Sequence, residues 1–234
     1  MPKLLEHIRA AAFNLDGTLV DSAPDLALAA NSMLELLGYA PLTKNRIEGL
    51  IGGGIDRLVD GVLIESIDRV AGPAVLAAAR SRFRQLYAER LFDRSRVYPG
   101  VTEGLRMLGE AGIRLCCVSN KESAFTLPLL EAAGLTRFFA FALCADCAEE
   151  RKPKPDLLLA ASARFQVAPG GMLYVGDSPT DIAAARAAAC PVAAVDYGYT
   201  DPRRLAEKRP DWIIGSIAEL VTLPAEPRSA NAEA

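Results

Sequence analysis

The sequence predicts an α/β protein whose core is a doubly wound, mostly parallel sheet interrupted by an inserted α-helical unit. Short apolar runs rich in β-forming residues alternate with amphipathic helical patterns, which is the order that βαβ units produce. The long segment between the first two runs, 14–112, carries helical periodicity and little strand signal. Polar residues follow directly on several runs, as is typical of sheets that bind ligands at their carboxyl ends. Together these observations indicate a Rossmann-like core with a helical cap.

The core is assembled from apolar runs of strand length, each followed by a helical pattern. We expect strands at 8–13, 113–118, 141–144, 172–175 and 191–195, with a weaker sixth at 212–214. We expect helices at about 101–111, 122–133, 155–165 and 179–189. Because helices separate the strands, the connections should be crossovers that leave neighbouring strands parallel.

The cap is expected at 23–92. In the first part of this segment, apolar residues recur at the i, i+3 and i+4 spacing of one helical face: Leu26, Ala29, Ala30, Met33, Leu34 and Leu37. Gly38 follows as a natural helix stop, and a second helical stretch runs through 73–91. We therefore assign 1–22 and 93–224 to the α/β core and 23–92 to the cap. The Ala-, Pro- and Glu-rich tail at 225–234 is expected to be frayed.

Composition excludes several classes of function. The chain of 234 residues has a formal net charge of −3 with interspersed signs, so we expect no nucleic-acid partner. No apolar run approaches the roughly 20 residues that a membrane span needs, and no secretory signal is recognisable. Five reduced cysteines suit a cytoplasmic protein, and Cys144 and Cys147 are interpreted as structural because no second cysteine pair or histidine cluster accompanies them. The protein is expected to be a monomer or a homodimer.

Distinctive polar residues follow four of the predicted strands. They are Asn14, Asp16 and Thr18; Ser119, Asn120 and Lys121; Lys152 and Lys154; and Asp177 and Asp181. Each group alone could be an ordinary turn, but parallel strands bring all four to one sheet edge. Carboxylates there would suit Mg²⁺, and a hydroxyl and a lysine can hold phosphate oxygens.

Two of these groups have competing interpretations. Asp181 lies three residues after Ser178, so it could be a helix-capping acid rather than a metal ligand. Asp177 directly follows a glycine at the strand end and is the stronger metal candidate. Lys152 precedes a proline-fixed turn and is the better phosphate ligand, whereas Lys154 is interpreted as a solvated charge.

At this point the chain resembles the haloacid dehalogenase superfamily, specifically its phosphatases. The first motif of that family, DxDGT, stands here as "NLDGT" at 14–18, and the second matches Ser119 and Asn120. The third matches Lys152 in "KPKPD", and the fourth matches "GD" at 176–177 with Asp181. The segments "LVDSAPDL" and "IGGGIDRL" look most like those of phosphoglycolate phosphatases. The resemblance covers nearly the whole chain.

The resemblance implies a mechanism and a set of site residues. The residue at position 14 would attack phosphorus to form an aspartyl-phosphate, and Asp16 would protonate the leaving alcohol and then activate water. Mg²⁺ would lie between position 14, the backbone carbonyl of Asp16, and Asp177, with Asp181 nearby. The substrate would be contacted by Thr18, Ser119, Asn120 and Lys152. Apart from the resemblance, the glycine run 52–54 of the cap is either a flexible turn or a loop whose backbone N–H groups approach an anion ahead of a helix N-terminus, and we predict a substrate contact at Gly53.

Asn14 departs from the family pattern at the nucleophile. An amide oxygen is a very poor nucleophile, but asparagine is almost isosteric with aspartate, so fold and phosphate pocket should persist. Three explanations are open: a substitution introduced to trap a ligand, a natural phospho-ligand-binding sensor without catalysis, or a sequence error. The chain as written is expected to be inactive or nearly so.

The substrate is not specified by the motifs. A Mg²⁺-dependent phosphomonoester hydrolase acting on 2-phosphoglycolate, or on a similar small phosphate ester, is the favoured function. A sugar-phosphate mutase shares the same core and is the nearest enzymatic alternative.

Overall fold

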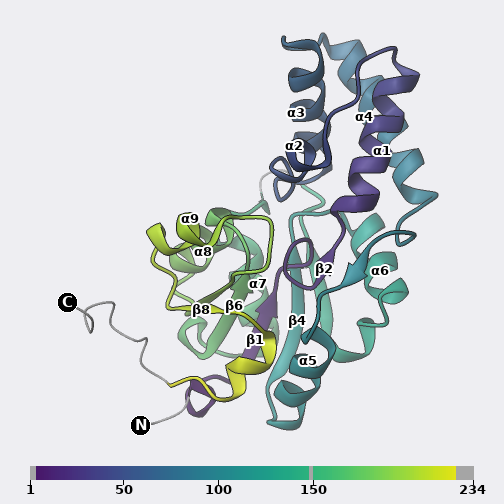
Figure 1. Cartoon of the computed structure of the whole chain (residues 1–234). Helices are drawn as coiled ribbons and strands as arrows, with labels where there is room; N and C mark the ends of the chain where they lie inside the picture. Colours follow the sequence, from purple (N-terminus) through teal and green to yellow (C-terminus); the bar gives the residue numbers. More distant parts are fainter. Residues whose placement is uncertain (1–3, 148–149, 225–234) are drawn as a thin grey trace.

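The computed structural model describes residues 4–147 and 150–224, and it confirms the predicted α/β fold. Six parallel strands form one sheet in the order β5-β4-β1-β6-β7-β8. Their bounds are β1 Ala10–Phe13, β4 Arg114–Ser119, β5 Phe141–Cys144, β6 Met172–Gly176, β7 Val192–Val195 and β8 Trp212–Ile214. The first strand lies at the centre, and the strand order reverses beside it (Figure 1). In doubly wound sheets, ligands bind at this reversal.

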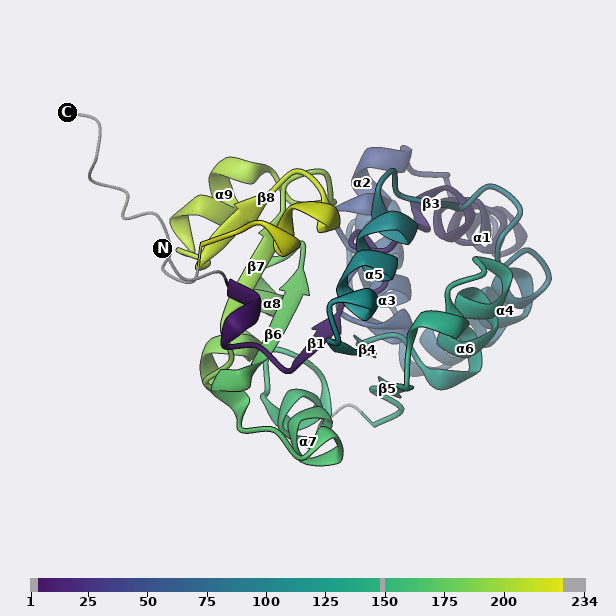
Figure 2. The same cartoon turned by 90° about the horizontal axis from the view of Figure 1, so that it is seen from below.

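Alternating side chains of β1 divide the core into two layers. Phe13 packs in one apolar cluster with residues of helices α5 and α6, whereas Ala12 packs in another with residues of α7 and α8. Strand residues point to opposite faces in turn, so both faces of this fully buried strand are covered. The helices are α5 Val101–Glu110, α6 Ser123–Ala132, α7 Asp156–Phe165, α8 Pro179–Ala187 and α9 Pro202–Glu207. Figure 2 shows the helices around the sheet from below.

The segment between β2 (Val20–Asp21) and β3 (Arg96–Val97) forms a helical unit above the carboxyl ends of the strands (Figure 1). Its helices are α1 Ala23–Leu36, α2 Lys44–Glu48, α3 Ile55–Ile67 and α4 Pro73–Ala88. They share an apolar cluster of their own, which also includes Phe125 of α6, so the cap packs directly on the core. Gly38 has a φ of 77°, the left-handed conformation that ends a helix, as expected from its position.

The two connections between cap and core lie side by side. Strand β2, Val20–Asp21, pairs antiparallel with β3, Arg96–Val97. Next to them, Asp25 accepts hydrogen bonds from the backbone N–H groups of Arg94 and Ser95 and from the Ser95 hydroxyl. Sequence analysis missed this ribbon, because a two-residue strand is too short to show an alternating pattern.

Element boundaries differ from the expected ones by a few residues at most. The first strand begins at Ala10 rather than at 8, and α8 ends at Ala187 rather than at 189. The expected tail, 225–234, lies outside the described residues. No helix in the described part of the chain is both long and apolar enough to cross a membrane.

Candidate active site

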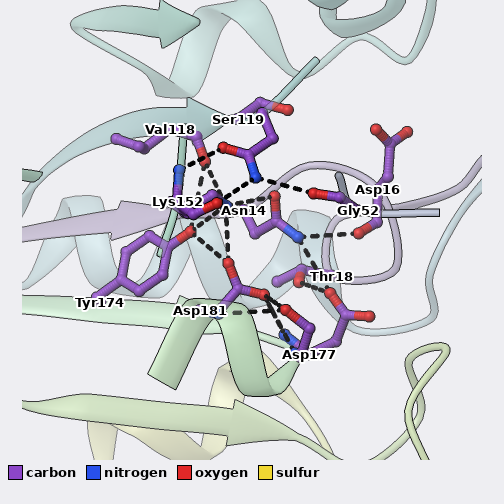
Figure 3. Close-up of polar contacts among 12 residues, drawn as sticks. Asn14, Asp16, Thr18, Gly52, Val118, Ser119, Lys152, Tyr174, Asp177 and Asp181 are labelled. Carbon is purple, nitrogen blue, oxygen red and sulfur yellow. Dashed lines mark hydrogen bonds and ion pairs between the residues drawn. The ribbon is translucent and has the colours of Figure 1, made fainter. Parts of the chain in front are cut away.

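The polar loops that follow β1, β4, β5 and β6 meet at one edge of the sheet (Figure 3). All six strands are parallel, so their carboxyl ends share that edge. The loops border a cavity of about 240 Å³ beneath the cap. Its core-side lining includes Asn14, Asp16, Lys152, Asp177 and Asp181, and its cap-side lining includes Glu48, Gly49, Ile51 and Gly52. The polar residues that the sequence predicted at one edge of the sheet therefore do lie together there.

Asn14 is held by hydrogen bonds through both ends of its amide (Figure 3). Its Nδ2 donates to the backbone carbonyl of Asp16 at 3.0 Å and to Oδ1 of Asp177 at 3.1 Å. Its Oδ1 accepts from Nζ of Lys152 at 3.0 Å. The reversed amide would set its NH₂ group against an ammonium and its oxygen against two acceptors. The surroundings therefore allow only one orientation.

Lys152 is the centre of a buried ion network. Its side chain is 2% exposed, and its Nζ lies 2.7 Å from Oδ1 of Asp181 and 2.6 Å from the hydroxyl of Tyr174. The Asp181 carboxylate also closes a capping box with Ser178 at the start of α8. Such a network compensates the cost of burying both charges. Asp181 is thus the helix-capping acid and the partner of Lys152, and its role as a metal ligand stays a prediction.

Asn120 holds the loops together rather than facing the cavity with free polar groups. Its Nδ2 donates to the carbonyls of Gly52 and Lys152, at 2.9 and 3.1 Å, and its Oδ1 accepts from the backbone N–H of Lys152 at 2.8 Å. These three bonds link the cap's glycine run to the loop that carries the lysine. We expected a substrate contact here, but the geometry gives Asn120 a positioning role.

Two other expected substrate contacts also differ in placement. Thr18 is fully buried and donates its hydroxyl to Oδ1 of Asp177 at 2.9 Å, so it orients that carboxylate. Within the glycine run, Gly52 and Gly54 line a pocket at the site, whereas a side chain at Gly53 would meet Arg57. The glycine run therefore faces the core site through Gly52 and Gly54, and not through Gly53, the residue predicted from the sequence.

Asp16 presents its backbone and its side chain to different surroundings. Its carbonyl faces Asn14, whereas its carboxylate turns away, as Figure 3 shows. Carboxylate Oδ1 lies 2.6 Å from Nζ of Lys121 and also accepts a hydrogen bond from the hydroxyl of Ser22. The ammonium of Lys121 in turn contacts the hydroxyl of Tyr87, from cap helix α4, at 2.8 Å.

A second, smaller pocket of about 20 Å³ lies against Lys121 and Asp16. The core side contributes Asn14, Asp16, Ser119, Asn120 and Lys121, and the cap side contributes Leu26, Ile51, Gly52, Gly54, Ile55 and Leu58. The pocket is therefore polar toward the core and apolar toward the cap. Ser119 lines it as expected of a substrate contact, although its hydroxyl oxygen already accepts from the backbone N–H of Lys121.

Comparison with known proteins identifies the family. The family model of the haloacid dehalogenase-like hydrolases matches residues 11–195, which include every motif described above. The chain belongs to the haloacid dehalogenase-like hydrolases. Among relatives in this family, a phosphoglycolate phosphatase of Nitrosospira multiformis is 44% identical over 92% of this chain and 95% of its own. One of Neisseria meningitidis is 40% identical over 94% of this chain and 95% of its own.

Solved structures share the architecture. A crystal structure described as a predicted phosphoglycolate phosphatase from Haemophilus somnus superposes with a TM-score of 0.87 at 33% identity, covering 92% of this chain and 97% of that one. A β-phosphoglucomutase from Clostridium difficile superposes with a TM-score of 0.75 at 20% identity, covering 91% of this chain and 93% of that one. At that identity the second likeness shows the fold alone.

The donor set of this haloacid dehalogenase-like hydrolase does not fit a divalent cation while Asn14 is present. The Asp16 carbonyl and Oδ1 of Asp177 offer two oxygens, but the Asn14 NH₂ group already donates to both. Hard cations require oxygen ligands, and turning the amide oxygen inward would set the NH₂ group against Lys152. Among residues 4–147 and 150–224, no group of three or more acidic, histidine or cysteine side chains could hold a metal ion.

The two aspartates after β6 have opposite electrostatic surroundings. Burial, and then the neighbouring Asp181 carboxylate, raise the pKa of Asp177 to about 7, although hydrogen bonds from Thr18, Asn14 and Tyr199 act in the other direction. Burial also acts to raise the pKa of Asp181, but the ion pair with Lys152 and the hydrogen bonds around it lower that pKa below its usual range. The positive charge of Lys152 therefore stabilises the ionised carboxylate of Asp181 far more than that of Asp177.

Sequence reasoning missed the tyrosines of the site. Tyr174 occupies the middle of strand β6, where the apolar pattern predicts a core side chain, yet its hydroxyl meets Lys152 and Asp181. Tyr87 lies on a cap helix far from any motif. No local pattern distinguishes them from packing aromatics, because their lysine partners lie 22 and 34 residues away in the sequence.

Proposed function

We propose that this chain is a phosphomonoester hydrolase of the phosphoglycolate phosphatase type whose turnover is blocked at Asn14. The observation that carries the proposal is the constellation of Asn14, Lys152 and Asp177 beside the cavity. It keeps the shape of an acyl-phosphate-forming site and lacks only the nucleophilic oxygen. The names of the relatives at 44% and 40% identity support the same substrate class.

With aspartate at position 14, the protein's own groups would supply both half-reactions. A carboxylate oxygen attacks phosphorus and forms an aspartyl-phosphate, while the bond to the leaving alkoxide breaks. Asp16 gives that alkoxide a proton and then takes one from the water that attacks the phosphorus, which regenerates the carboxylate and releases phosphate. Lys152, 3.0 Å from the position-14 oxygen, balances the developing charge.

Aspartate at position 14 would also change the fit for a cation. The site would then offer three oxygens, from position 14, the Asp16 carbonyl and Asp177, in place of two oxygens and an NH₂ group. Bound Mg²⁺ would supply charge neutralisation of the transferred phosphoryl group. We therefore propose Mg²⁺ as the cofactor of the aspartate form.

The small pocket favours a short substrate. A single water needs roughly 10–15 Å³ of such space, so about 20 Å³ accommodates a group the size of a carboxylate and no sugar ring. Its apolar cap side and single lysine suit a two-carbon acid. These features favour 2-phosphoglycolate as a ligand whose carboxylate occupies the small pocket.

The test is phosphate release from a panel of phosphate esters by the Asn14→Asp variant. We expect Mg²⁺-dependent hydrolysis, with 2-phosphoglycolate among the best substrates, at several orders of magnitude above the unmodified chain. The matched control is Asn45→Asp, the same change at an exposed cap position, which should stay as inactive as the unmodified protein. An Asn14→Asp protein that hydrolyses no ester would contradict the proposal.

One observation favours a second function, a phospho-ligand sensor. The Asn14 amide satisfies the Asp16 carbonyl and Asp177 without any metal, so the site is internally complete. A sensor would bind phosphate esters with Asn14 present and would gain no hydrolysis from Asn14→Asp.

A further inference from the structure

Lys121 is the cation of the small pocket, and the proposed reaction gives it no role. Its side chain is 4% exposed and lies between the carboxylate of Asp16 and the hydroxyl of Tyr87. Among the lining residues of the small pocket, it is the only one with a positive charge. A buried ammonium at this place interacts both with any ligand in the small pocket and with the carboxylate of Asp16.

The ammonium group has capacity left for a ligand. A lysine has three N–H donors, and the described partners of Lys121 Nζ are two, Oδ1 of Asp16 and the hydroxyl of Tyr87. Burial of Tyr87 fixes the cap side of this contact, because its ring packs between Phe83 and Phe125. The charge is thus held in place with one donor unassigned.

The remaining walls explain why one anionic group would be selected. The cap side of the pocket presents Leu26, Ile55 and Leu58, which cannot hydrogen-bond to a ligand through their side chains. Desolvation in such surroundings strengthens a charge-assisted hydrogen bond and penalises a polar group that lacks a partner. A small anionic group contacting Lys121 is the occupant that these walls favour.

We propose that Lys121 binds the carboxylate of a two-carbon phosphorylated acid and, through the same ammonium, positions Asp16. The inference rests on the proposed function and adds to it the residue that recognises the substrate carboxylate. A substrate carboxylate shares the ammonium with Asp16 and so loosens the ion pair that holds the Asp16 carboxylate away from position 14. Recognition of the acid is thereby coupled to the group that protonates the leaving oxygen.

The first experiment uses the unmodified protein, in which Asn14 prevents turnover. Calorimetry compares 2-phosphoglycolate with ethyl phosphate, which has the same two carbons and a methyl group in place of the carboxylate. We expect 2-phosphoglycolate to bind about 10- to 100-fold more tightly, as one hydrogen bond between charged groups provides. Equal affinities, or binding of neither ester, would overturn the inference without any mutation, whereas the proposed function is tested separately by hydrolysis in the Asn14→Asp variant.

The second experiment removes the charge. Lys121→Met should weaken 2-phosphoglycolate about 10- to 100-fold more than ethyl phosphate, and Lys121→Arg should recover part of the preference. Lys44→Met, at the exposed lysine of the cap, is the matched control and should leave the preference intact. A loss that is equal for both esters would mean that Lys121 only supports the fold, and would refute the assignment.

The third experiment separates this inference from the proposed function. In the Asn14→Asp background, Lys121→Met should lower the ratio of kcat/KM for 2-phosphoglycolate to that for ethyl phosphate. Hydrolysis of both esters with an unchanged ratio would leave the phosphatase standing and remove the role of Lys121. Tyr87→Phe keeps the Lys121 ammonium and removes one of its hydrogen-bond partners. The preference for 2-phosphoglycolate over ethyl phosphate should therefore persist in this variant.

Discussion

Lys152 and Lys121 are both buried lysines that contact an aspartate at the site, but they join different parts of the molecule. Lys152 meets Asp181 and Tyr174, which both come from the α/β core. Lys121 meets Asp16 of the core and Tyr87 of cap helix α4. One ion network is therefore complete within the core, whereas the other requires the cap to be in place.

Because only one of the two lysine networks includes a cap residue, the networks suit different steps of the proposed reaction. The network of Lys152 orients position 14 and needs nothing from the cap, so it suits the step that every substrate shares. The network of Lys121 borders a pocket whose other wall is the cap, so it suits the step that distinguishes substrates. Removing either lysine leaves an uncompensated carboxylate, and that carboxylate is more deeply buried at Asp181, which is 1% exposed, than at Asp16, which is 8% exposed.

The largest effect on stability is expected at Lys152. Lys152→Met leaves Asp181 buried without its cation, and losing one partner of a buried pair costs about 3–5 kcal/mol. Urea unfolding should show this loss in the free energy of unfolding. Lys44→Met, at a side chain that is 49% exposed, is the control and should change that energy by less than about 0.5 kcal/mol. A cost for Lys152→Met as small as the control's would mean that the core network is not a buried ion pair in solution.

A pH dependence should distinguish the two aspartates that follow β6. The pKa of Asp177 is raised to about 7 in the folded protein, so the folded state holds a proton there that the unfolded state releases at lower pH. The free energy of unfolding should therefore fall as pH rises from about 4 to 7, by up to about 1.4 kcal/mol per pH unit, and level off above. The pKa of Asp181 is lowered in the folded protein, so its contribution to the free energy of unfolding is lost only at lower pH, on acidification.

Chemical unfolding in metal-free buffer at several pH values, on the unmodified protein and on Asp177→Asn, isolates this contribution. The variant should lack the decline between pH 4 and 7. Parallel curves for the two proteins would contradict the raised pKa.

Asn14→Asp should lower stability in the absence of metal and make it depend on Mg²⁺. The new carboxylate replaces a donor that lies 3.1 Å from Oδ1 of Asp177, so attraction becomes repulsion. We expect a loss of about 1–3 kcal/mol in chelator and recovery in millimolar Mg²⁺. Thermal unfolding of both proteins with and without Mg²⁺ measures this, and the unmodified protein should respond much less. Equal Mg²⁺ responses would show that the Asn14 amide does not occupy the place of the cation.

The smallest effect is expected at a cap–core ion pair whose residues line neither of the two pockets. Arg84 of α4 pairs with Glu122, at the start of α6, at 2.5 Å, with side chains 32% and 17% exposed. A double-mutant cycle with Arg84→Met and Glu122→Gln should give a coupling energy of about 0.5–1 kcal/mol that decreases with salt. The pair of Arg106 and Glu103 within α5 is the control for an exposed ion pair. A shift in ester preference in these variants would contradict the assignment of selectivity to the Lys121 contact.

Most of the architecture could be predicted because its signals are local. A strand such as β6 is a short apolar run after a glycine-containing turn, and α1 shows its buried face as a helical spacing that Gly38 ends. The same reasoning placed Asn14, Lys152 and Asp177 together, since parallel strands bring their carboxyl ends to one edge. The ribbon of β2 and β3 was missed because pairing of two-residue strands depends on what lies opposite them.

The sequence by itself determined the fold class, the edge of the sheet at which the polar residues meet, and the exceptional amide at position 14. Only the tertiary structure decided which way that amide points, because its orientation depends on Lys152 and Asp177, which are far away in the chain. It likewise decided that Thr18 and Asn120 orient other groups and that Lys121 faces a pocket closed by the cap. Residue type and spacing limit the chemistry that a side chain can perform, but its partners are set by the packing of distant segments.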